Sequence, residues 1–208
     1  MGYGLVIQTA PVGEPLTTAE AKKQVEVASA ITAHDAYLDS LVTAARQEAE
    51  RVTGRQILTA TWDLFLDRFP SAVNPIWIPL PPLASITSIV YTDDAGVSQT
   101  WAASKYVVSV SSEPGRVSLA YGEYYPVTRA VADAVRVRFA AGYGAAAAVP
   151  KLLKQAMLLR VADLFAHRAS IITGTISSEL PKTVQWIYDQ FRVGDEFYCY
   201  GPASYATA

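Results

Sequence analysis

The stretch of this sequence closest to a chemical motif is a glycine-rich turn. Residues 142–147 read Gly-Tyr-Gly-Ala-Ala-Ala, follow a predicted strand and precede a predicted helix, as in a loose form of the dinucleotide-binding turn. In that motif the helix begins at the second glycine, so that its N-terminus faces the pyrophosphate. Here Pro150 places the helix start several residues after Gly144, and the preceding strand belongs to a run of hairpins. The turn therefore predicts a connection between a sheet and a helix, and a nucleotide-binding enzyme using Gly142 to Gly144 is the weaker alternative.

The remaining reactive side chains do not form a recognisable catalytic or metal-binding set. His34 and His167 are far apart, and neither belongs to the group of three or four converging ligands that a metal site needs. Cys199 has no base beside it in the sequence, and Asp93 and Asp94 precede a glycine as in a hairpin turn. His167 is better explained by a position near a helix C-terminus or in an interface. We therefore expect no catalytic residue, no metal and no cofactor, and hence no enzyme.

The C-terminal segment is unusually aromatic for a stretch without a regular pattern. Gly201 and Pro202 interrupt it, so that it cannot form a core helix. Such a segment either folds back onto its own chain or inserts into a groove of another molecule, and the sequence leaves both open. The short extended stretch 3–12 presents the same choice. The aromatic side chains of the segment are Phe197, Tyr198, Tyr200 and Tyr205.

Two helices are predicted before the middle of the chain. Thr17 and Glu20 have the spacing of a capping box, which predicts a short helix that runs to about residue 28. A longer helix is predicted from about residue 33, and Gly54 is placed to end it in the left-handed conformation. Its apolar residues recur at steps of three and four and line one face: Leu38, Leu41, Val42, Ala45, Ala49 and Val52.

Helical periodicity returns near the C-terminal end. Pro150 suits the first turn of a helix over 151–170, which is apolar in almost every direction except along Arg160, Asp163 and His167. This composition predicts a helix that is buried on most sides. A last helix is predicted from Pro181 to about Arg192.

Between the two helical parts the pattern changes to a period of two residues, which is typical of half-buried strands. Short connections between the strands indicate antiparallel pairing in a sheet. The predicted strands are 60–68, 76–78, 85–92, 97–101, 105–110, 116–121 and 134–139. The fold class predicted from these elements is α+β, a helical bundle with an inserted antiparallel β module. The predicted parts are an extended arm at 1–14, a helical core at 15–55 and 149–193, a β domain at 56–148 and an extended tail at 194–208.

The amino-acid composition limits the classes of protein to which this chain can belong. Of 208 residues, 51% are hydrophobic and 17% charged, an apolar balance that favours surfaces covered by other subunits. A net charge of −2 gives no support for a dedicated nucleic-acid binder. No long apolar run or signal peptide is present, so we expect no membrane association and synthesis in a reducing cytoplasm. A single cysteine excludes an internal disulfide.

Several phrases, taken in order, resemble one family. They include Leu-Thr-Thr-Ala-Glu-Ala-Lys at 16–22 and Ile-Pro-Leu-Pro-Pro-Leu at 78–83. Their order and spacing are similar to those of head-tail connector (adaptor) proteins of long-tailed bacteriophages and of the related gene transfer agents, over about residues 14–192. The matching phrases lie at 16–22, 38–55, 61–62, 78–83, 86–91, 114–116, 140–144, 149–150 and 153–156.

The resemblance implies a structural virion protein without catalysis. Members of this family form a dodecameric ring beneath the portal protein and extend the DNA channel toward the stopper or tail-terminator protein, with DNA passing through without sequence specificity. Relatives use their C-terminal segment to grip the portal, which would assign portal binding to Phe197, Tyr198, Tyr200 and Tyr205. The expected location is the head-tail junction of a virion or gene transfer agent particle made in the bacterial cytoplasm.

The leading hypothesis is therefore a ring-forming adaptor in which the long helices pack side by side between subunits. The residues predicted for this ring interface are Leu38, Leu41, Arg46, Arg160 and His167. A second hypothesis is another neck or tail-completion component, and the nucleotide-binding enzyme described above is the third.

Overall fold

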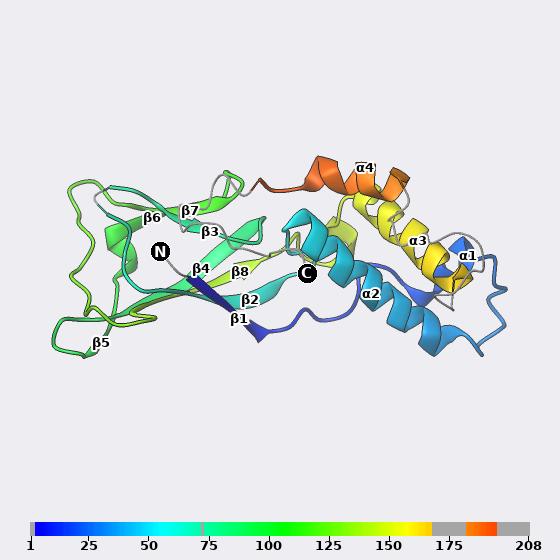
Figure 1. Cartoon of the computed structure of the whole chain (residues 1–208), viewed down its shortest axis with the longest axis horizontal. Helices are drawn as coiled ribbons and strands as arrows, with labels where there is room; N and C mark the ends of the chain where they lie inside the picture. The colour runs from blue at the N-terminus through cyan, green and yellow to red at the C-terminus, as the bar shows by residue number, and fades with distance from the viewer. Residues whose placement is uncertain (1–2, 72, 168–181, 195–208) are drawn as a thin grey trace, which may run out of the picture. The chain divides into compact units, whose positions relative to one another are not determined.

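The computed structural model describes residues 3–71, 73–167 and 182–194, which form two compact units. The helical unit contains residues 13–58 and the described part of 144–192, and the β unit contains residues 3–12 and 59–143. Helices that flank the middle of the sequence thus build one unit, and the other unit combines the strands between them with the N-terminal strand (Figure 1). The predicted α+β class, a helical bundle with an inserted antiparallel β module, is confirmed.

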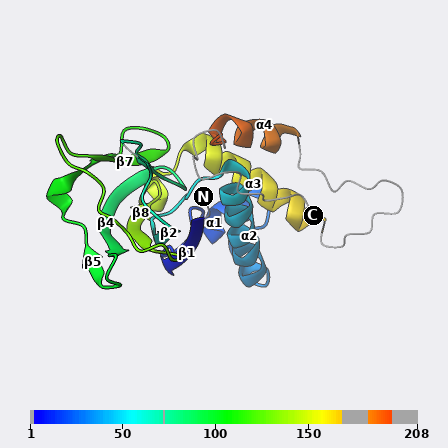
Figure 2. The same ribbon diagram turned by 60° about the vertical axis from the view of Figure 1, so that its left-hand side comes forward.

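The helical unit contains four α-helices: α1 (Thr18–Gln24), α2 (Asp35–Thr53), α3 (Lys151–Ala166) and α4 (Lys182–Phe191). A short 3-10 turn, η2 (Ala146–Ala148), precedes α3. Both α2 and α3 contact every other α-helix of the unit. Figures 1 and 2 show α4 lying along α3. Apolar residues between the helices are fully buried, among them Leu38, Val42, Leu153, Met157 and Tyr188.

The helix ends follow the signals in the sequence. The Thr17 side chain accepts from the backbone N–H of Glu20, whose carboxylate accepts from the backbone N–H of Thr17, which confirms the capping box. Gly54 ends α2 with a φ of 67°, a left-handed conformation that glycine adopts without steric cost. Helix α1 is shorter than predicted, because the chain leaves the helical conformation at Glu26, where φ is 57°.

The β unit contains two sheets where the sequence predicted one. The five-stranded sheet has the order β1-β2-β8-β4-β5, and the three-stranded sheet has the order β3-β7-β6. All neighbouring strands are antiparallel. The strands are β1 (Tyr3–Thr9), β2 (Ala60–Leu66), β3 (Ile76–Ile78), β4 (Leu83–Thr92), β5 (Ser98–Thr100), β6 (Tyr106–Ser109), β7 (Gly115–Leu119) and β8 (Val135–Ala141), with a 3-10 turn, η1 (Ala103–Lys105), before β6.

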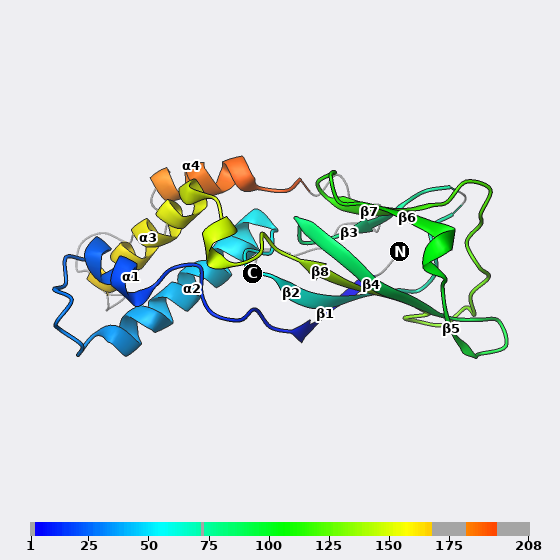
Figure 3. The ribbon, with the colours of Figure 1, turned by 180° about the vertical axis from the view of Figure 1, so that it is seen from behind.

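The core of the β unit lies between these two sheets (Figure 3). Alternating side chains of β2 and β8, such as Leu64 and Val137, point into this core, as the period of two residues predicts. The three-stranded sheet contributes Ile76, Ile78 and Val117. Packing two antiparallel sheets face to face buries one side of each, which gives so short a module a core of its own.

The stretch predicted as a free N-terminal arm is a strand of the five-stranded sheet. Residues 3–9 pair with β2 in an antiparallel register that places Leu5 opposite Leu64 and Val6 opposite Asp63. Of the two possibilities that the sequence left open for this stretch, the structure shows that it packs on its own chain. The pairing partner lies more than fifty residues further along, so no local pattern could indicate it.

Candidate functional site

The glycine-rich turn lies between β8 and η2. The backbone N–H of Gly142 donates to the carbonyl of Pro82, 2.9 Å away, and this amide is therefore not available to a phosphate. Helix α3 begins at Lys151, several residues after Gly144. The geometry thus lacks the helix N-terminus directly behind the second glycine that a dinucleotide-binding turn requires.

The two histidines lie in the helical unit and face aromatic or acidic neighbours. The ring of His34 meets the ring of Phe165 edge-on, with centroids 5.8 Å apart. His167 follows the last turn of α3, and its Nδ1 lies 3.2 Å from a carboxylate oxygen of Asp163. Within the residues that the structure describes, no group of three or more histidine, cysteine, aspartate or glutamate side chains could hold a metal ion.

Asp93 forms the hairpin turn that the sequence predicted. Its carboxylate accepts from the backbone N–H of Val97 and from the side-chain amide of Gln99, at 2.8 and 3.0 Å. These hydrogen bonds lower the pKa of the Asp93 carboxyl, first through Gln99 and then through Val97. The carboxylate is fully used in closing the turn between β4 and β5.

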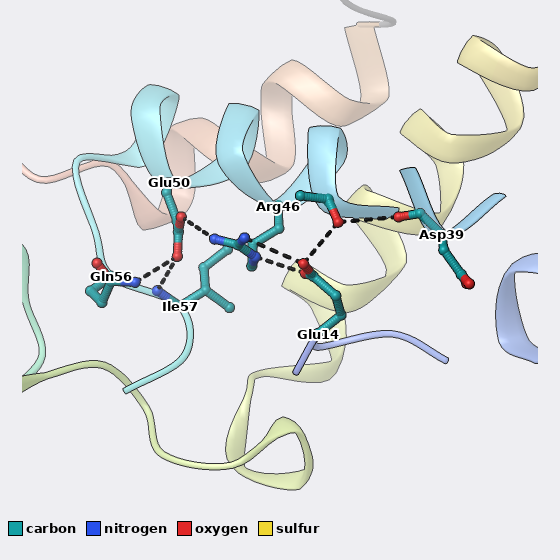
Figure 4. A network of polar contacts seen from close by, with 7 residues as sticks. Glu14, Asp39, Arg46, Glu50, Gln56 and Ile57 are labelled. Atoms are coloured by element: carbon teal, nitrogen blue, oxygen red, sulfur yellow. Dashed lines mark hydrogen bonds and ion pairs between the residues drawn. The ribbon is translucent and has the colours of Figure 1, made fainter. Parts of the chain in front are cut away.

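The most connected polar group of the helical unit is centred on Arg46 of α2. In Figure 4 its guanidinium lies between the carboxylates of Glu14 and Glu50. Arg46 Nε donates to Glu14 at 2.7 Å and Nη1 donates to Glu50 at 2.8 Å. The other oxygen of Glu50 accepts from the side-chain amide of Gln56 and from the backbone N–H of Ile57. The group thereby connects the segment before α1, the middle of α2 and the segment after it.

Burial governs the electrostatics of this group. It raises the pKa of Glu50 above the ordinary carboxyl value of 4.5, in spite of the opposing effect of the Arg46 charge. Burial disfavours the charge of Arg46 as well, but the hydrogen bonds and charges of Glu14 and Glu50 outweigh it and raise its pKa. These side chains bond to one another and to the backbone of the chain. A fixed ion pair of this kind holds parts of the fold in place. We see no substrate-facing group in it.

A second ion-pair cluster connects α2 with α3. Arg160 Nε donates to Glu48 at 2.8 Å, and Nη1 donates to Asp163 one turn further along α3. Tyr188 of α4 is completely buried nearby, and burial raises its pKa, with the Glu48 charge adding to the rise. Its hydroxyl has no hydrogen-bond partner among the described residues.

The residues predicted for a ring interface occupy different environments. The side chains of Leu38 and Leu41 are buried within the helical unit, and Arg46 is 9% exposed in its ion-pair group. Arg160 is held by Glu48 and Asp163, and the side chain of His167 is 53% exposed. The structure thus brings Arg160 and His167 together through Asp163, while Leu38 and Leu41 belong to the core.

Helix α3 is less buried than its composition predicts. Its buried residues are Leu153, Ala156, Met157 and Val161, which form one face. Leu152 is 40% exposed, and several further apolar side chains of the helix are only half-buried. The three neighbouring helices cover one face of α3. In the described part of the chain, the apolar side chains on its other faces stay accessible. On α4, Trp186 is 63% exposed.

The β unit presents a loop with exposed aromatic residues between β7 and β8. Tyr125 anchors the loop, because its ring stacks on Phe69 with centroids 5.1 Å apart and its hydroxyl donates to the carbonyl of Asn74. Burial raises the pKa of Tyr125 to about 12. Tyr121 and Tyr124 on the same loop are 107% and 82% exposed. Sequence analysis missed this loop, because nothing in a single sequence distinguishes a buried loop tyrosine from an exposed one.

An ion pair in the sheet was also missed. Asp63 is a charged residue between the apolar residues Trp62 and Leu64, but it is 1% exposed. Arg138, opposite it on β8, donates to both of its carboxylate oxygens at 2.8 and 2.7 Å. This ion pair therefore joins a buried carboxylate to an arginine whose side chain is 35% exposed. The sequence does not indicate the pair, because it does not fix the register of β2 with β8.

The aromatic residues predicted to bind a portal, Phe197, Tyr198, Tyr200 and Tyr205, lie outside the described residues. Cys199 lies outside them as well. Their assignment stays a prediction.

No protein-family model matches the sequence, and no curated protein matches it. Solved structures do match. A chain in the neck of an empty gene transfer agent particle, computed with C6 symmetry, is 25% identical with a TM-score of 0.75, over 92% of this chain and 96% of the other. A chain of the virion of a native gene transfer agent particle is 24% identical, with a TM-score of 0.73 over 91% and 95% of the two chains. A chain in the neck of a native particle, computed with C12 symmetry, is 23% identical, with a TM-score of 0.72 over 92% and 96%.

The chain therefore shares its α+β fold with chains that are found in gene transfer agent particles. Because the similarity covers nearly the full length of both chains, it includes the helical unit and the β unit alike. The predicted resemblance to the head-tail connector family of long-tailed phages and gene transfer agents is confirmed.

Proposed function

We propose that this chain is a structural protein of the neck of a tailed phage or gene transfer agent particle, where it acts as the head-tail connector. The observation that carries this proposal is the match to a gene transfer agent neck chain at a TM-score of 0.75 over 92% of this chain and 96% of that one. The match includes both the helical unit and the β unit. The ion pairs of the helical unit hold its segments together, which supports a structural role as well.

The chain assembles into a ring in this proposal. The matched neck structures were computed with C6 and C12 symmetry, which supports a cyclic arrangement, and twelve copies are expected from the family. Helices α3 and α4 leave apolar side chains such as Leu152 and Trp186 exposed, as an unassembled subunit would. His167 is the most accessible of the residues first predicted for the ring interface. Leu38, Leu41 and Arg46 are buried in the helical unit and contribute by shaping α2.

The ring lies beneath the portal protein and above the stopper or tail-terminator protein, with the C-terminal segment that includes Phe197 and Tyr198 gripping the portal. DNA passes through the ring without sequence-specific contacts. A formal net charge of −2 is compatible with a channel that does not retain DNA. Among the described residues no helix combines the length and hydropathy needed to cross a membrane.

The experiment that tests this function removes the gene from a cell that produces the particles. We expect filled heads without attached tails, counted by electron microscopy, and recovery of complete particles when the wild-type gene is supplied. Normal particle yield in the deletion strain would contradict the proposal. A defect confined to the distal tail would instead favour a tail-completion component.

A further inference from the structure

The two sheets of the β unit end in four edge strands, and their lengths differ. Strands β5 and β3 have three residues each and β6 has four, whereas β1 has seven. Very short edge strands are one way in which proteins prevent sheets from adding to each other. Three of the four edges are protected in this way, and β1 is not.

The composition of β1 also lacks the usual protection. The strand contains no charged residue and no proline, the residues that commonly block addition at an edge. Val6 is 47% exposed and Ile7 is 43% exposed. The pairing of β1 with β2 is regular from Tyr3 to Ile7, and its register shifts only between Ile7 and Thr9. Within the described part of the chain β1 pairs on one side only, with β2. Figure 1 shows β1 lying along β2 at the border of the five-stranded sheet.

We propose that β1 is a subunit interface and that an extended segment of a second copy of this chain pairs with its free edge. This inference rests on the proposed function, since a ring places another copy beside each subunit. An added strand satisfies the outward backbone groups of β1 and covers Val6 and Ile7 at the same time. The interaction is heterologous, because one copy offers its edge and the next offers a different segment, and interfaces of this type form rings when the rotation between copies closes.

Hydrogen exchange gives a direct test. In the isolated protein the outward-facing amides of residues 4–9 exchange quickly, and in purified particles we expect their exchange to slow by about tenfold or more, since each tenfold corresponds to about 1.4 kcal/mol of protection. A peptide covering β5 serves as the internal control and keeps its rate. Equal exchange of residues 4–9 in both samples would overturn the proposal.

Substitutions separate strand pairing from folding. Ile7→Lys places a charge on the edge, and we expect the variant to fold with an unchanged unfolding midpoint but to enter particles at least about tenfold less efficiently than wild type. Ile7→Thr keeps a β-branched, uncharged side chain and should enter normally. Val12→Lys is the matched control, because Val12 is 94% exposed and lies beyond the strand. Normal entry of Ile7→Lys, or an equal loss with Val12→Lys, would overturn the proposal.

Photo-crosslinking identifies the occupant. With a benzophenone amino acid at position 6, irradiated particles should yield adducts between copies of this chain, identified by mass spectrometry. Adducts with a different neck protein would overturn the choice of a second copy while leaving the proposed function intact. If wild-type chain is absent from the particles altogether, the proposed function fails instead, so the two failures are distinguishable.

Discussion

At the scale of single residues, Glu50 is the acceptor on which the polar contacts of the helical unit converge. It accepts from Arg46, from Gln56 and from the backbone N–H of Ile57, all at 3.1 Å or less. Through these bonds one side chain fixes how the chain leaves α2. Its partners are largely buried, so removing it leaves several polar groups without acceptors.

We predict that Glu50→Ala lowers the free energy of unfolding by about 2 kcal/mol or more, because Arg46 Nη1 and the Ile57 amide lose their acceptor. Urea denaturation followed by circular dichroism measures this change. Gln47→Ala, an exposed position on the same helix, is the control and should change stability by less than about 0.5 kcal/mol. A Glu50→Ala variant as stable as this control would contradict the structural role given to Glu50.

The capping box at Thr17 gives a prediction that depends on pH. The backbone amide and the side chain of Thr17 hold the pKa of Glu20 below 4.5. Because the folded pKa is depressed, the stabilisation is complete above the unfolded pKa and is lost as the pH falls through the folded pKa. Thr17→Ala removes the side-chain hydrogen bond but keeps the backbone amide, so it should raise the Glu20 pKa only part of the way toward 4.5 in an NMR titration and cost about 1 kcal/mol of stability.

The neighbouring residue provides a matched control for that titration. The Thr18 hydroxyl donates to Asp39, not to Glu20. Thr18→Ala should therefore leave the Glu20 pKa depressed. An unchanged pKa in Thr17→Ala would show that the Thr17 side chain does not lower it and that the backbone amide, which alanine retains, does so alone.

At the scale of elements, the close approach of β7 to β4 determines how the two sheets pack. A Cβ atom on Gly115 would lie 2.5 Å from Cβ of Leu83, which is 5% exposed. No side chain fits there unless the sheets separate. Glycine at this position is therefore a requirement of the sheet packing.

We predict that Gly115→Ala lowers the unfolding free energy by about 2 kcal/mol, a typical cost of overpacking a core. Thermal or chemical denaturation measures the effect. Gly4→Ala is the comparison, since its Cβ would lie 3.8 Å from the nearest atom, an ordinary contact. If both variants unfold alike, the sheets have room that the structure does not show.

These elements also show how far the sequence alone could go. The helix ends at Thr17 and Gly54 and the strands from 60 to 141 follow local rules of capping and alternation, and they were predicted close to their observed bounds. The pairing of β1 with β2, the division into two sheets and the burial of Asp63 depend on residues distant in sequence, which one sequence does not reveal. The burial of α3 was overestimated, because an apolar helix predicts a need for cover without saying whether the cover comes from the same chain.

At the scale of the whole molecule, we expect a subunit whose exposed apolar surfaces are covered by partner proteins. Helices α3 and α4, the loop with Tyr121 and Tyr124 and the β1 edge all leave apolar groups accessible in the described residues. A structural protein of a particle neck has neighbours that can cover such surfaces. An independent soluble enzyme would gain nothing from them.

A prediction for the whole molecule concerns the C-terminal segment, residues 195–208. Deleting residues 195–208 should leave the unfolding midpoint unchanged and should abolish attachment of the protein to portal-bearing heads. Co-sedimentation with purified heads measures attachment. A truncated protein that binds as well as the full chain would remove the segment from the mechanism.

The most direct test of the central claim is a cryo-electron microscopy map of the particle neck from a producing strain, compared with one from a strain that carries an epitope-tagged chain. The account predicts a ring of copies of this chain, with both the helical and the β unit recognisable, between the portal and the tail, and tag density on that ring. A neck in which this chain has no place, in particles that are otherwise complete, would contradict it.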